Sequence, residues 1–587
     1  MIDSLQNLPP GLIMVLGALL LPLLGGRLSA IGALVLSLAS AVLFWFTPDG
    51  NYGNIELFGE TLNMVRIDAW SRIFGVVFHI AAITASIYAL HVRDSKQHVA
   101  GMIYAGSAIA AACAGDMVTL FVCWELTAIA SVFLIWASGT EQAFRSGMRY
   151  LIIQVTSGVL LLSGAILIYA ETGSLTFDHF MGLSPGEKAS IWDYSLGAQL
   201  IFVAFGIKCA FPLLHNWLQD SYPEATPTGT VFLSAFTTKL AIYSLARGFA
   251  GTEEMIWIGC AMTLFPIVFA VIENDLRRVL AYSLNNQLGF MVVGIGIGTE
   301  LALNGTAAHA FCHIIYKALL FMSMGAVLHR VGTTKATELG GLHKSMPLTT
   351  IFCVIGAGSI SGFPLLSGFI SKSMIISEAG EAHMFWVWIV LLIASAGVME
   401  HSGIKIPFFA FFAHDSGKRV KEAPLNMLVA MGIGAGLCIG LGIFYTPLYN
   451  MLPHGPPMAH HHGHDEAYQP FTTGHVVTQL QLLIFAALAF VALMKSGLYP
   501  EEQRSTNLDT DWVYRKFLPR TIGLLGVVIA FFDSGIRKLS IGSLNAFLKG
   551  LSKTFNEKGL MGRTWATSTM AVWAALLLGI CLLIYYS

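Results

Sequence analysis

Apolar runs of about 20 residues recur along almost the whole chain, and they constrain its fold more than any other feature. A run of this length is what a helix needs to cross the hydrocarbon core of a membrane. Only 11% of the 587 residues are charged, which is too few to cover a water-soluble body of this size. The sequence therefore predicts an all-α polytopic membrane protein. About sixteen spans are expected, fourteen of them before residue 450, at 8–26, 29–46, 71–90, 99–114, 117–137, 150–170, 196–216, 228–248, 256–272, 279–297, 302–328, 348–376, 384–403, 425–446, 477–495 and 566–586.

Basic residues in the loops between these runs predict the orientation. With the N-terminus outside, only Arg66, Lys188 and Arg247 lie in outer loops. Cytoplasmic loops of membrane proteins carry an excess of Lys and Arg, so this asymmetry predicts an outside N-terminus. Residues 1–10 contain no Lys or Arg, which predicts a retained first helix rather than a cleaved signal. The thirteen basic residues of the inner loops are Arg27, Arg93, Lys96, Arg145, Arg149, Arg277, Arg278, Arg330, Lys335, Lys344, Lys418, Arg419 and Lys421.

Charge and cysteine usage exclude several classes of function. The formal net charge of -1 removes the broad basic surface of a nucleic-acid-binding protein. All eight cysteines fall inside apolar runs, where they behave as small buried hydrophobes rather than as disulfides or ligands. The chain contains no CxxC pair and no Gly-rich dinucleotide fingerprint between a strand and a helix. We therefore predict no cofactor, no metal centre and no nucleic-acid partner.

Two segments near the C-terminus differ from the rest. Residues 447–475 carry no Lys or Arg and are predicted to form a long outer loop. Its histidines leave two interpretations open, a transition-metal site or a solvated loop, and the lack of a fixed ligand geometry favours the loop. Residues 536–555 place apolar and basic side chains at helical spacing, which predicts an amphipathic helix on a membrane or partner surface. The histidines are His454, His460, His461, His462, His464 and His475.

Five charged residues lie well inside the predicted spans. Glu125 has apolar residues on both sides within one run, and four later runs each contain a lysine. A charge at bilayer depth costs several kcal/mol, so each is a candidate functional residue, although an isolated one is often a structural ion pair. Five together favour function. The lysines are Lys208, Lys239, Lys317 and Lys372.

Spacing adds two histidines to this set. His309, His313 and Lys317 are four residues apart, so a helix places all three on one stripe. Imidazoles exchange protons near neutral pH, and neighbours on a stripe pass protons directly or through one water. The stripe therefore predicts a proton relay.

Helix breakers accompany two of the lysines. Pro212 follows Lys208 by four residues, and Pro364 interrupts the run that ends near Lys372. Broken helices at membrane depth are tolerated where they line protein or a hydrated cavity. The string Phe-Pro-Leu-Leu occurs at 211–214 and again at 363–366, a weak indication of two related halves.

The residue types also indicate a mechanism. A carboxylate and an ammonium about 4 Å apart attract by about 4 kcal/mol at an effective dielectric of about 20. A lysine whose Glu partner approaches and withdraws therefore changes its affinity for a proton. We expect such a change to pass laterally from Glu125 through Lys208, Lys239 and Lys317 to Lys372.

Several separated motifs resemble the proton-translocating antiporter-like family shared by respiratory complex I and the multisubunit Mrp Na+/H+ antiporters. They are Trp124-Glu125, KCAFPLLHNWLQDSYPEATPTGTVFLSAFTTKLAIY at 208–243, DLRRVLAYSLNNQLGF at 275–290, HAFCHIIYKALLF at 309–321 and GFPLLSGFISK at 362–372. The resemblance implies about fourteen core transmembrane helices, with two inverted five-helix repeats and broken helices 7 and 12. The expected divisions are helices 1–3 (1–98), the first repeat (99–250), the second repeat (251–420), helix 14 with the His-rich loop (421–475) and a C-terminal extension (476–587).

The resemblance also implies a role for each buried charge. Glu125 is similar to the helix-5 glutamate that pairs with the helix-7 lysine, here Lys208. Lys239 matches a bridging position in helix 8, the helix-11 relay corresponds to His309, His313 and Lys317, and the helix-12 exchanger corresponds to Lys372.

Two features bear on the subtype. Lysines at 239 and 372 make the core most similar to the D-type subunits of Mrp antiporters, whereas LDTDWVYRKFLPR at 508–520 resembles the tail of L-type complex I subunits. The segment 399–418 departs from the expected pattern after helix 13. Its Glu400, His401 and Lys405 form either an extra inlet or, as their place near a helix end favours, an interfacial structural contact.

Three functions follow as hypotheses. The leading one is a proton-translocating subunit of a Na+/H+ antiporter complex in the bacterial inner membrane, with other membrane subunits, protons and Na+ as partners. The second is an L-like proton-pumping subunit of a redox complex such as complex I or a membrane hydrogenase. The third is a membrane scaffold for inorganic-carbon uptake. In the first the chain is an ion-transport subunit, not an enzyme.

Overall fold

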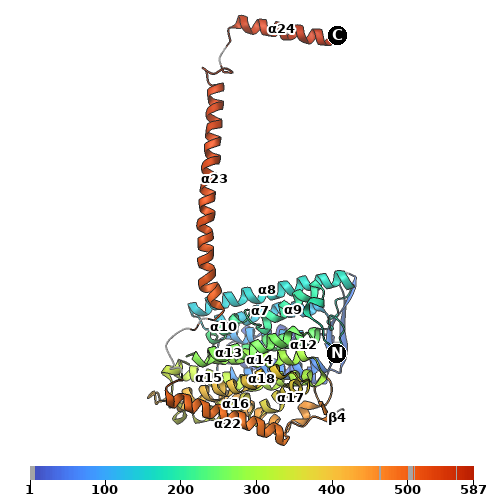
Figure 1. Ribbon diagram of the computed structural model, residues 1–587, viewed down its shortest axis with the longest axis vertical. Coiled ribbons are helices and arrows are strands. Elements are labelled where there is room, and N and C mark those ends of the chain that lie inside the picture. Colours follow the sequence, from blue (N-terminus) through green and yellow to red (C-terminus); the bar gives the residue numbers. More distant parts are fainter. Residues whose placement is uncertain are drawn as a thin grey trace. The chain divides into compact units, whose positions relative to one another are not determined.

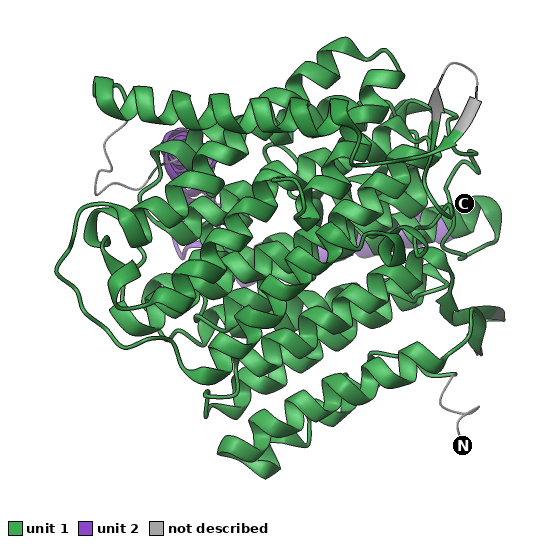
Figure 2. Cartoon of the chain, turned by 90° about the horizontal axis from the view of Figure 1, so that it is seen from below, with its two compact units in different colours: residues 1–509 green, residues 510–587 purple. Residues whose placement is uncertain are grey.

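The computed structural model describes residues 7–57, 59–461, 464–499, 507, 509–562 and 565–586. Contacts between residues divide the chain into two compact units, Met1–Asp509 and Thr510–Ser587 (Figure 2). The first unit holds every residue of the predicted relay. We describe each unit by itself.

The first helices flank a hairpin. Helices α2 (Leu12–Ala18), α3 (Leu21–Leu24) and α4 (Gly26–Phe46) precede the antiparallel strands β1 (Gly50–Leu57) and β2 (Glu60–Ile67). Gly50 pairs with Ile67, and Leu57 pairs with Glu60. Helix α5 (Ala69–Tyr88) begins at Asp68, whose carboxylate accepts from the Ser71 amide as an N-cap. We call the side of the bundle that carries this hairpin the hairpin face.

The middle of the unit contains seven further helices. The turn before α7 is fixed by Asp116, which caps the helix by accepting from the Thr119 amide. Helices α8 and α22 lie at opposite edges of the bundle (Figure 1). The helices are α6 (Ser95–Ala112), α7 (Met117–Trp136), α8 (Glu141–Thr172), α9 (Leu196–Cys209), α10 (Asn216–Ser221), α11 (Gly229–Ala235) and α12 (Thr237–Phe249), with 3-10 turns η1 (Ile191–Asp193) and η2 (Tyr222–Glu224).

The remaining helices complete the unit. Helices α13 and α14 pack closely because both contribute glycine, and a Cβ at Gly259 would lie 2.7 Å from the Gly289 carbonyl oxygen. The elements are α13 (Glu254–Ile272), α14 (Leu276–Ile297), α15 (Glu300–Val331), η3 (Ala336–Glu338), η4 (Leu342–Lys344), α16 (Pro347–Ser361), α17 (Ser367–Glu381), α18 (Phe385–Val398), the π-helix η5 (Met399–Ile404), α19 (Lys405–Pro407), the π-helix η6 (Phe408–Phe412), α20 (Leu425–Ile443), α21 (Thr446–Tyr449), β3 (Met458–His461), β4 (His464–Ala467) and α22 (Thr473–Ser496).

The predicted fold class is confirmed: the chain is an all-α polytopic membrane protein. Twelve helices of the described residues are long and apolar enough to span a membrane, and α9 and α16 are shorter apolar helices. Helix α15 lies deep in the bundle, since 94% of the residues in its apolar 18-residue stretch are buried. In α8, at the edge, the corresponding share is 33%. The arrangement of the helices into two inverted repeats stays a prediction, as do the divisions of the chain.

Both helix breaks that the prolines predicted are present, and they share one backbone signature. Leu213 has φ +70° and Leu365 has φ +72°, and each is the third residue of a Phe-Pro-Leu-Leu string. The Phe211 amide donates to the Gly206 carbonyl at 3.0 Å, and the Phe363 amide donates to the Gly358 carbonyl at 3.0 Å. The repeated string therefore encodes the same turn twice. A third break, at Phe236 between α11 and α12, carries neither proline nor glycine and was not predicted.

The two C-terminal segments predicted from composition fold as a short hairpin and as part of a long helix. Residues 462 and 463 of the His-rich loop lie outside the described residues, and β3 and β4 form a short antiparallel hairpin around them. In the second unit, η7 (Val513–Phe517) leads into α23 (Leu518–Phe555) and α24 (Thr567–Tyr586). The expected amphipathic helix at 536–555 is the second half of α23, which has no buried residues.

Candidate functional site

Lys208 lies in the last turn of α9, directly before the first helix break. Its side chain is fully buried. The ammonium donates to the Trp124 carbonyl at 2.6 Å and to Thr127 Oγ1 at 3.0 Å, and lies 4.2 Å from the centre of the Trp124 ring. Carbonyl dipoles and a ring face replace water around this buried amine.

Glu125 projects from α7 and is half-buried. Its Oε1 atom is buried without a hydrogen-bond partner among the described residues, and it rests against Gly158 of α8, where a Cβ would overlap the carboxylate. Glu125 and Lys208 interact electrostatically, although they are not among the ion pairs within 4.0 Å of the described residues. The two groups are therefore close but separable.

The hydrogen-bond partner of Lys239 is a backbone carbonyl beside the break between α11 and α12. Its fully buried ammonium donates to the Ser234 carbonyl at 2.6 Å, two residues before the break at Phe236. The interrupted helix leaves this carbonyl available, because regular i to i+4 bonding ends there. A carbonyl dipole thus faces the amine at each of these two lysines.

The predicted stripe on α15 exists. His309, His313 and Lys317 are fully buried on one helix. His309 Nδ1 lies 3.0 Å from Ser371 Oγ, and Nε2 lies 3.5 Å from the Tyr316 hydroxyl. Both ring nitrogens of His313 and the Lys317 ammonium have no hydrogen-bond partner among the described residues. Buried polar atoms of this kind are normally hydrogen-bonded to ordered water.

Lys372 follows the second helix break. It is almost fully buried, and its ammonium donates to the Ile360 carbonyl at the end of α16 at 3.1 Å. The ring of Phe290 lies 5.2 Å away. The two helix breaks are similar, but Lys208 lies before the turn of the first break, whereas Lys372 lies after the turn of the second.

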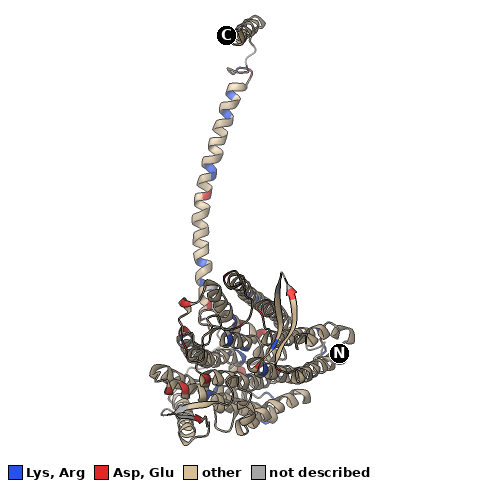
Figure 3. Ribbon diagram, turned by 90° about the vertical axis from the view of Figure 1, so that its right-hand side faces the viewer, with Lys and Arg blue, Asp and Glu red and all other residues tan. Residues whose placement is uncertain are grey.

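Five of the seven predicted residues form one electrostatic cluster. His313 interacts with Lys239, His309, Lys317 and Lys372. Glu125 and Lys208 interact with each other as a pair. Figure 3 marks in blue and red where the ribbon carries Lys or Arg and Asp or Glu, with several such positions inside the bundle.

Sequence reasoning missed the polar groups that hold these residues. Ser371 and Tyr316 flank His309, and the Tyr316 hydroxyl also donates to Gln287 Oε1 at 3.2 Å. Their positions next to Lys372 and Lys317 in the chain are the only sequence signal that could have identified them. The carbonyls of Trp124 and Ser234 carry no sequence signal, because every residue has one.

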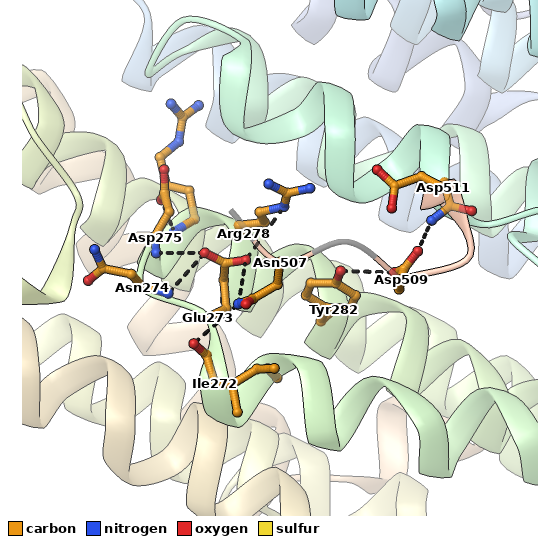
Figure 4. Close-up of polar contacts among 12 residues, drawn as sticks. Ile272, Glu273, Asn274, Asp275, Arg278, Tyr282, Asn507, Asp509 and Asp511 are labelled. Atoms are coloured by element: carbon orange, nitrogen blue, oxygen red, sulfur yellow. Dashed lines mark hydrogen bonds and ion pairs between the residues drawn. The ribbon is translucent and has the colours of Figure 1, made fainter. Parts of the chain in front are cut away.

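A second polar cluster lies at the turn between α13 and α14 (Figure 4). The Asn507 amide donates to Glu273 Oε2 at 3.4 Å. Asp509 accepts from the Tyr282 hydroxyl at 2.9 Å and lies 3.3 Å from His215 Nε2, just after the first helix break. Residues 507 and 509 are therefore held beside that break.

The same turn is held by Lys405. This residue is fully buried, and its ammonium donates to the carbonyls of Val271 and, at 2.8 Å, Glu273. A cation at a helix C-terminus satisfies carbonyls that lack helical partners. Lys405 thus makes a structural contact near a helix end, as expected, but within the protein rather than at its surface.

Comparison with known proteins identifies the family. Residues 114–397 match the family model described as NADH:quinone oxidoreductase/Mrp antiporter, TM. The N subunit of the NADH-quinone oxidoreductase of Desulforudis audaxviator is 30% identical over 384 residues, which cover 61% of this chain and 75% of that protein. The chain belongs to the NADH:quinone oxidoreductase/Mrp antiporter family of membrane subunits. The family predicted from the motifs is therefore confirmed.

Other relatives carry different names. The D subunit of the Na(+)/H(+) antiporter of Alkalihalophilus pseudofirmus is 34% identical, over 51% of this chain and 62% of that protein. The A/B subunit of a probable K(+)/H(+) antiporter of Rhizobium meliloti is 31% identical, over 60% of this chain and 37% of that protein. The chain thus spans less than two thirds of these two relatives. The fold is shared with a chain of the Mrp complex from a Dietzia species, with a TM-score of 0.70, 22% identity, and coverage of 98% of this chain and 62% of that one.

Proposed function

We propose that this chain is the proton-translocating subunit of a multisubunit Na+/H+ antiporter complex in the bacterial inner membrane. The observation that carries the proposal is the burial of six basic groups and one carboxylate inside a single membrane bundle. Burying so many ionisable groups costs several kcal/mol each, and they are retained where a charge or proton must move. With the N-terminus outside, the hairpin face is the outer face, and other membrane subunits of the complex are the partners.

Protons move along the buried groups in two stages. Glu125 and Lys208 form the first stage: withdrawal of the carboxylate weakens the attraction that holds the extra proton on Lys208. The second stage is the cluster of Lys239, the α15 stripe and Lys372, in which neighbouring cations repel one another. A proton that arrives at Lys239 therefore favours release from the next group. Water connects the two stages, since no protein group of the pairs described above joins Lys208 to Lys239.

Replacement of Lys208 tests the proposal. In the complete complex, assayed in inside-out vesicles by dye quenching, we expect Lys208→Ala to lower Na+-driven proton movement by at least about a hundredfold. Lys208→Arg keeps the charge but does not release a proton, so it should fail equally. Lys188→Ala, at an exposed loop lysine, is the matched control and should transport normally. Normal transport in Lys208→Ala, with a normal amount of complex, would refute the proposal.

A second candidate is favoured by one observation. The relative covered over 75% of its length is named as the N subunit of an NADH-quinone oxidoreductase, and hydrogenase-4 component B of Escherichia coli is 26% identical over 67% of this chain. Both names point to redox-driven complexes. Purification of the native complex separates the candidates: iron-sulfur or flavin absorbance, with proton movement driven by an electron donor rather than by Na+, would favour the redox complex.

A further inference from the structure

The stretch from Phe385 to Phe412 is the most irregular helix of the bundle. Two π-helical turns, η5 and η6, flank α19. Pro407 contributes, because it has no amide hydrogen to donate within the helix. π-turns widen a helix and re-aim its side chains, and they are frequent at functional sites. The first of them contains His401, which the proposed relay does not use.

His401 is fully buried and only half-satisfied. Its Nδ1 atom lies 2.8 Å from Ser402 Oγ. The Ser402 hydroxyl donates in turn to Ser283 Oγ of α14 at 2.6 Å. This arrangement fixes the ring. The Nε2 atom is buried and has no hydrogen-bond partner among the described residues, so the free side of a fixed imidazole points into the bundle.

The π-turn is pressed against the second helix break. A Cβ at Gly403 would overlap the Ser361 hydroxyl. Ser361 follows Ile360, whose carbonyl accepts the hydrogen bond of the Lys372 ammonium. His401 also interacts electrostatically with Lys317, Lys372 and Lys405. The packing of the π-turn against the end of α16 and these electrostatic interactions together place His401 near Lys372 and Lys317.

We propose that His401 is a further proton-carrying group, which exchanges protons with Lys372 and Lys317 and branches the relay toward the face opposite the hairpin. The inference rests on the proposed function. In each step the ammonium of one lysine loses a proton to Nε2, directly or through water, and becomes a neutral amine while His401 becomes an imidazolium. The reverse step restores both groups, so no other reactant is needed.

The location of Lys405 gives the branch its direction. Lys405 lies four residues after His401, and its ammonium donates to the last carbonyls of α13, at the end of the bundle opposite the hairpin face. His401 therefore lies between the buried lysines and that end. Because Lys405 satisfies the helix end by itself, His401 is not required for that contact.

Histidine-to-glutamine exchange tests the proposal in the complete complex. Glutamine keeps a hydrogen-bonding side chain of similar size but cannot carry a proton. We expect His401→Gln to slow proton movement by at least about tenfold per assembled complex. The matched control is His79→Gln: His79 is also buried, but it bonds to Ser40 Oγ and the Gly75 carbonyl in α5, and its variant should transport normally.

The outcomes separate this inference from the proposed function. Loss of transport in Lys208→Ala together with normal transport in His401→Gln would overturn the inference alone. Normal transport in both would overturn both. Should His401→Gln fail to assemble, Ser402→Ala removes the hydroxyl that orients the ring with little change in volume. A slowed Ser402→Ala then supports the branch, and a normal rate overturns it.

Discussion

Gly158 offers the sharpest test of the first stage of the proposed relay, because the substitution moves Glu125 without replacing it. A methyl group at position 158 would overlap Oε1 and Cδ of Glu125 and lie 3.1 Å from Cγ. The carboxylate must retreat by about 2 Å to reach ordinary van der Waals separation. The carboxylate is the far end of a flexible side chain. The Glu125 side chain, rather than the backbone of α8, should therefore move to make room for the methyl group.

The size of the effect follows from Coulomb's law. At an effective dielectric of about 20, any pair of unit charges about 5 Å apart loses about 1 kcal/mol of attraction when the separation grows by about 2 Å. That change is about fivefold in an equilibrium. We therefore expect Gly158→Ala to slow proton movement by about fivefold. Alanine is the better helix former by up to about 1 kcal/mol, so a weaker α8 cannot account for the loss.

Dye quenching in inside-out vesicles, normalised to the amount of complex, measures the rate. Gly436→Ala in α20 is the matched control, since a Cβ there meets no atom within 4 Å. Aspartate at position 125 is shorter than glutamate and leaves room for the methyl group. The double variant Glu125→Asp with Gly158→Ala should therefore transport faster than Gly158→Ala alone. A normal rate in Gly158→Ala would refute the placement of Glu125, and so would a slow rate that the double variant does not relieve.

Two further predictions concern the loops opposite the hairpin face. Lys405→Met removes the charged donor to the last carbonyls of α13. The free energy of unfolding should therefore fall by about 2 to 3 kcal/mol, which is measured as a lower midpoint of thermal unfolding in detergent. An unchanged midpoint would contradict the capping role of Lys405. Hydrogen bonds from Arg419 and Lys344 hold the pKa of Asp415 well below its usual value. The ionised carboxylate therefore stabilises the folded loop above about pH 4, and this stabilisation is lost as the pH falls further. Hydrogen exchange of residues 413–419 should be faster in Asp415→Asn at pH 7, with the gap narrowing below about pH 4; equal exchange at pH 7 refutes the contact.

Most of the helices were predictable because hydropathy and helix length obey one physical limit, the thickness of the hydrocarbon core. The span expected at 8–26 is an exception, since it is divided into the short helices α2 and α3. The breaks at Leu213 and Leu365 were predictable from proline, which removes an amide donor. The break at Phe236 was not, because neither proline nor glycine marks it in the sequence. The β1–β2 hairpin was also missed, since short strands outside the membrane leave no apolar run.

Sequence alone identified the ionisable residues that lie inside apolar runs, because a charge in an apolar run is visible without coordinates. It also determined the α15 stripe, since helical spacing fixes which residues share a face. Tertiary structure decided how these groups are partnered: the carbonyls of Trp124, Ser234 and Ile360 accept from three lysines that lie on other turns or helices. Backbone carbonyls are the same in every residue, so only the fold, by bringing distant segments together and interrupting helices, selects the ones that face a buried amine.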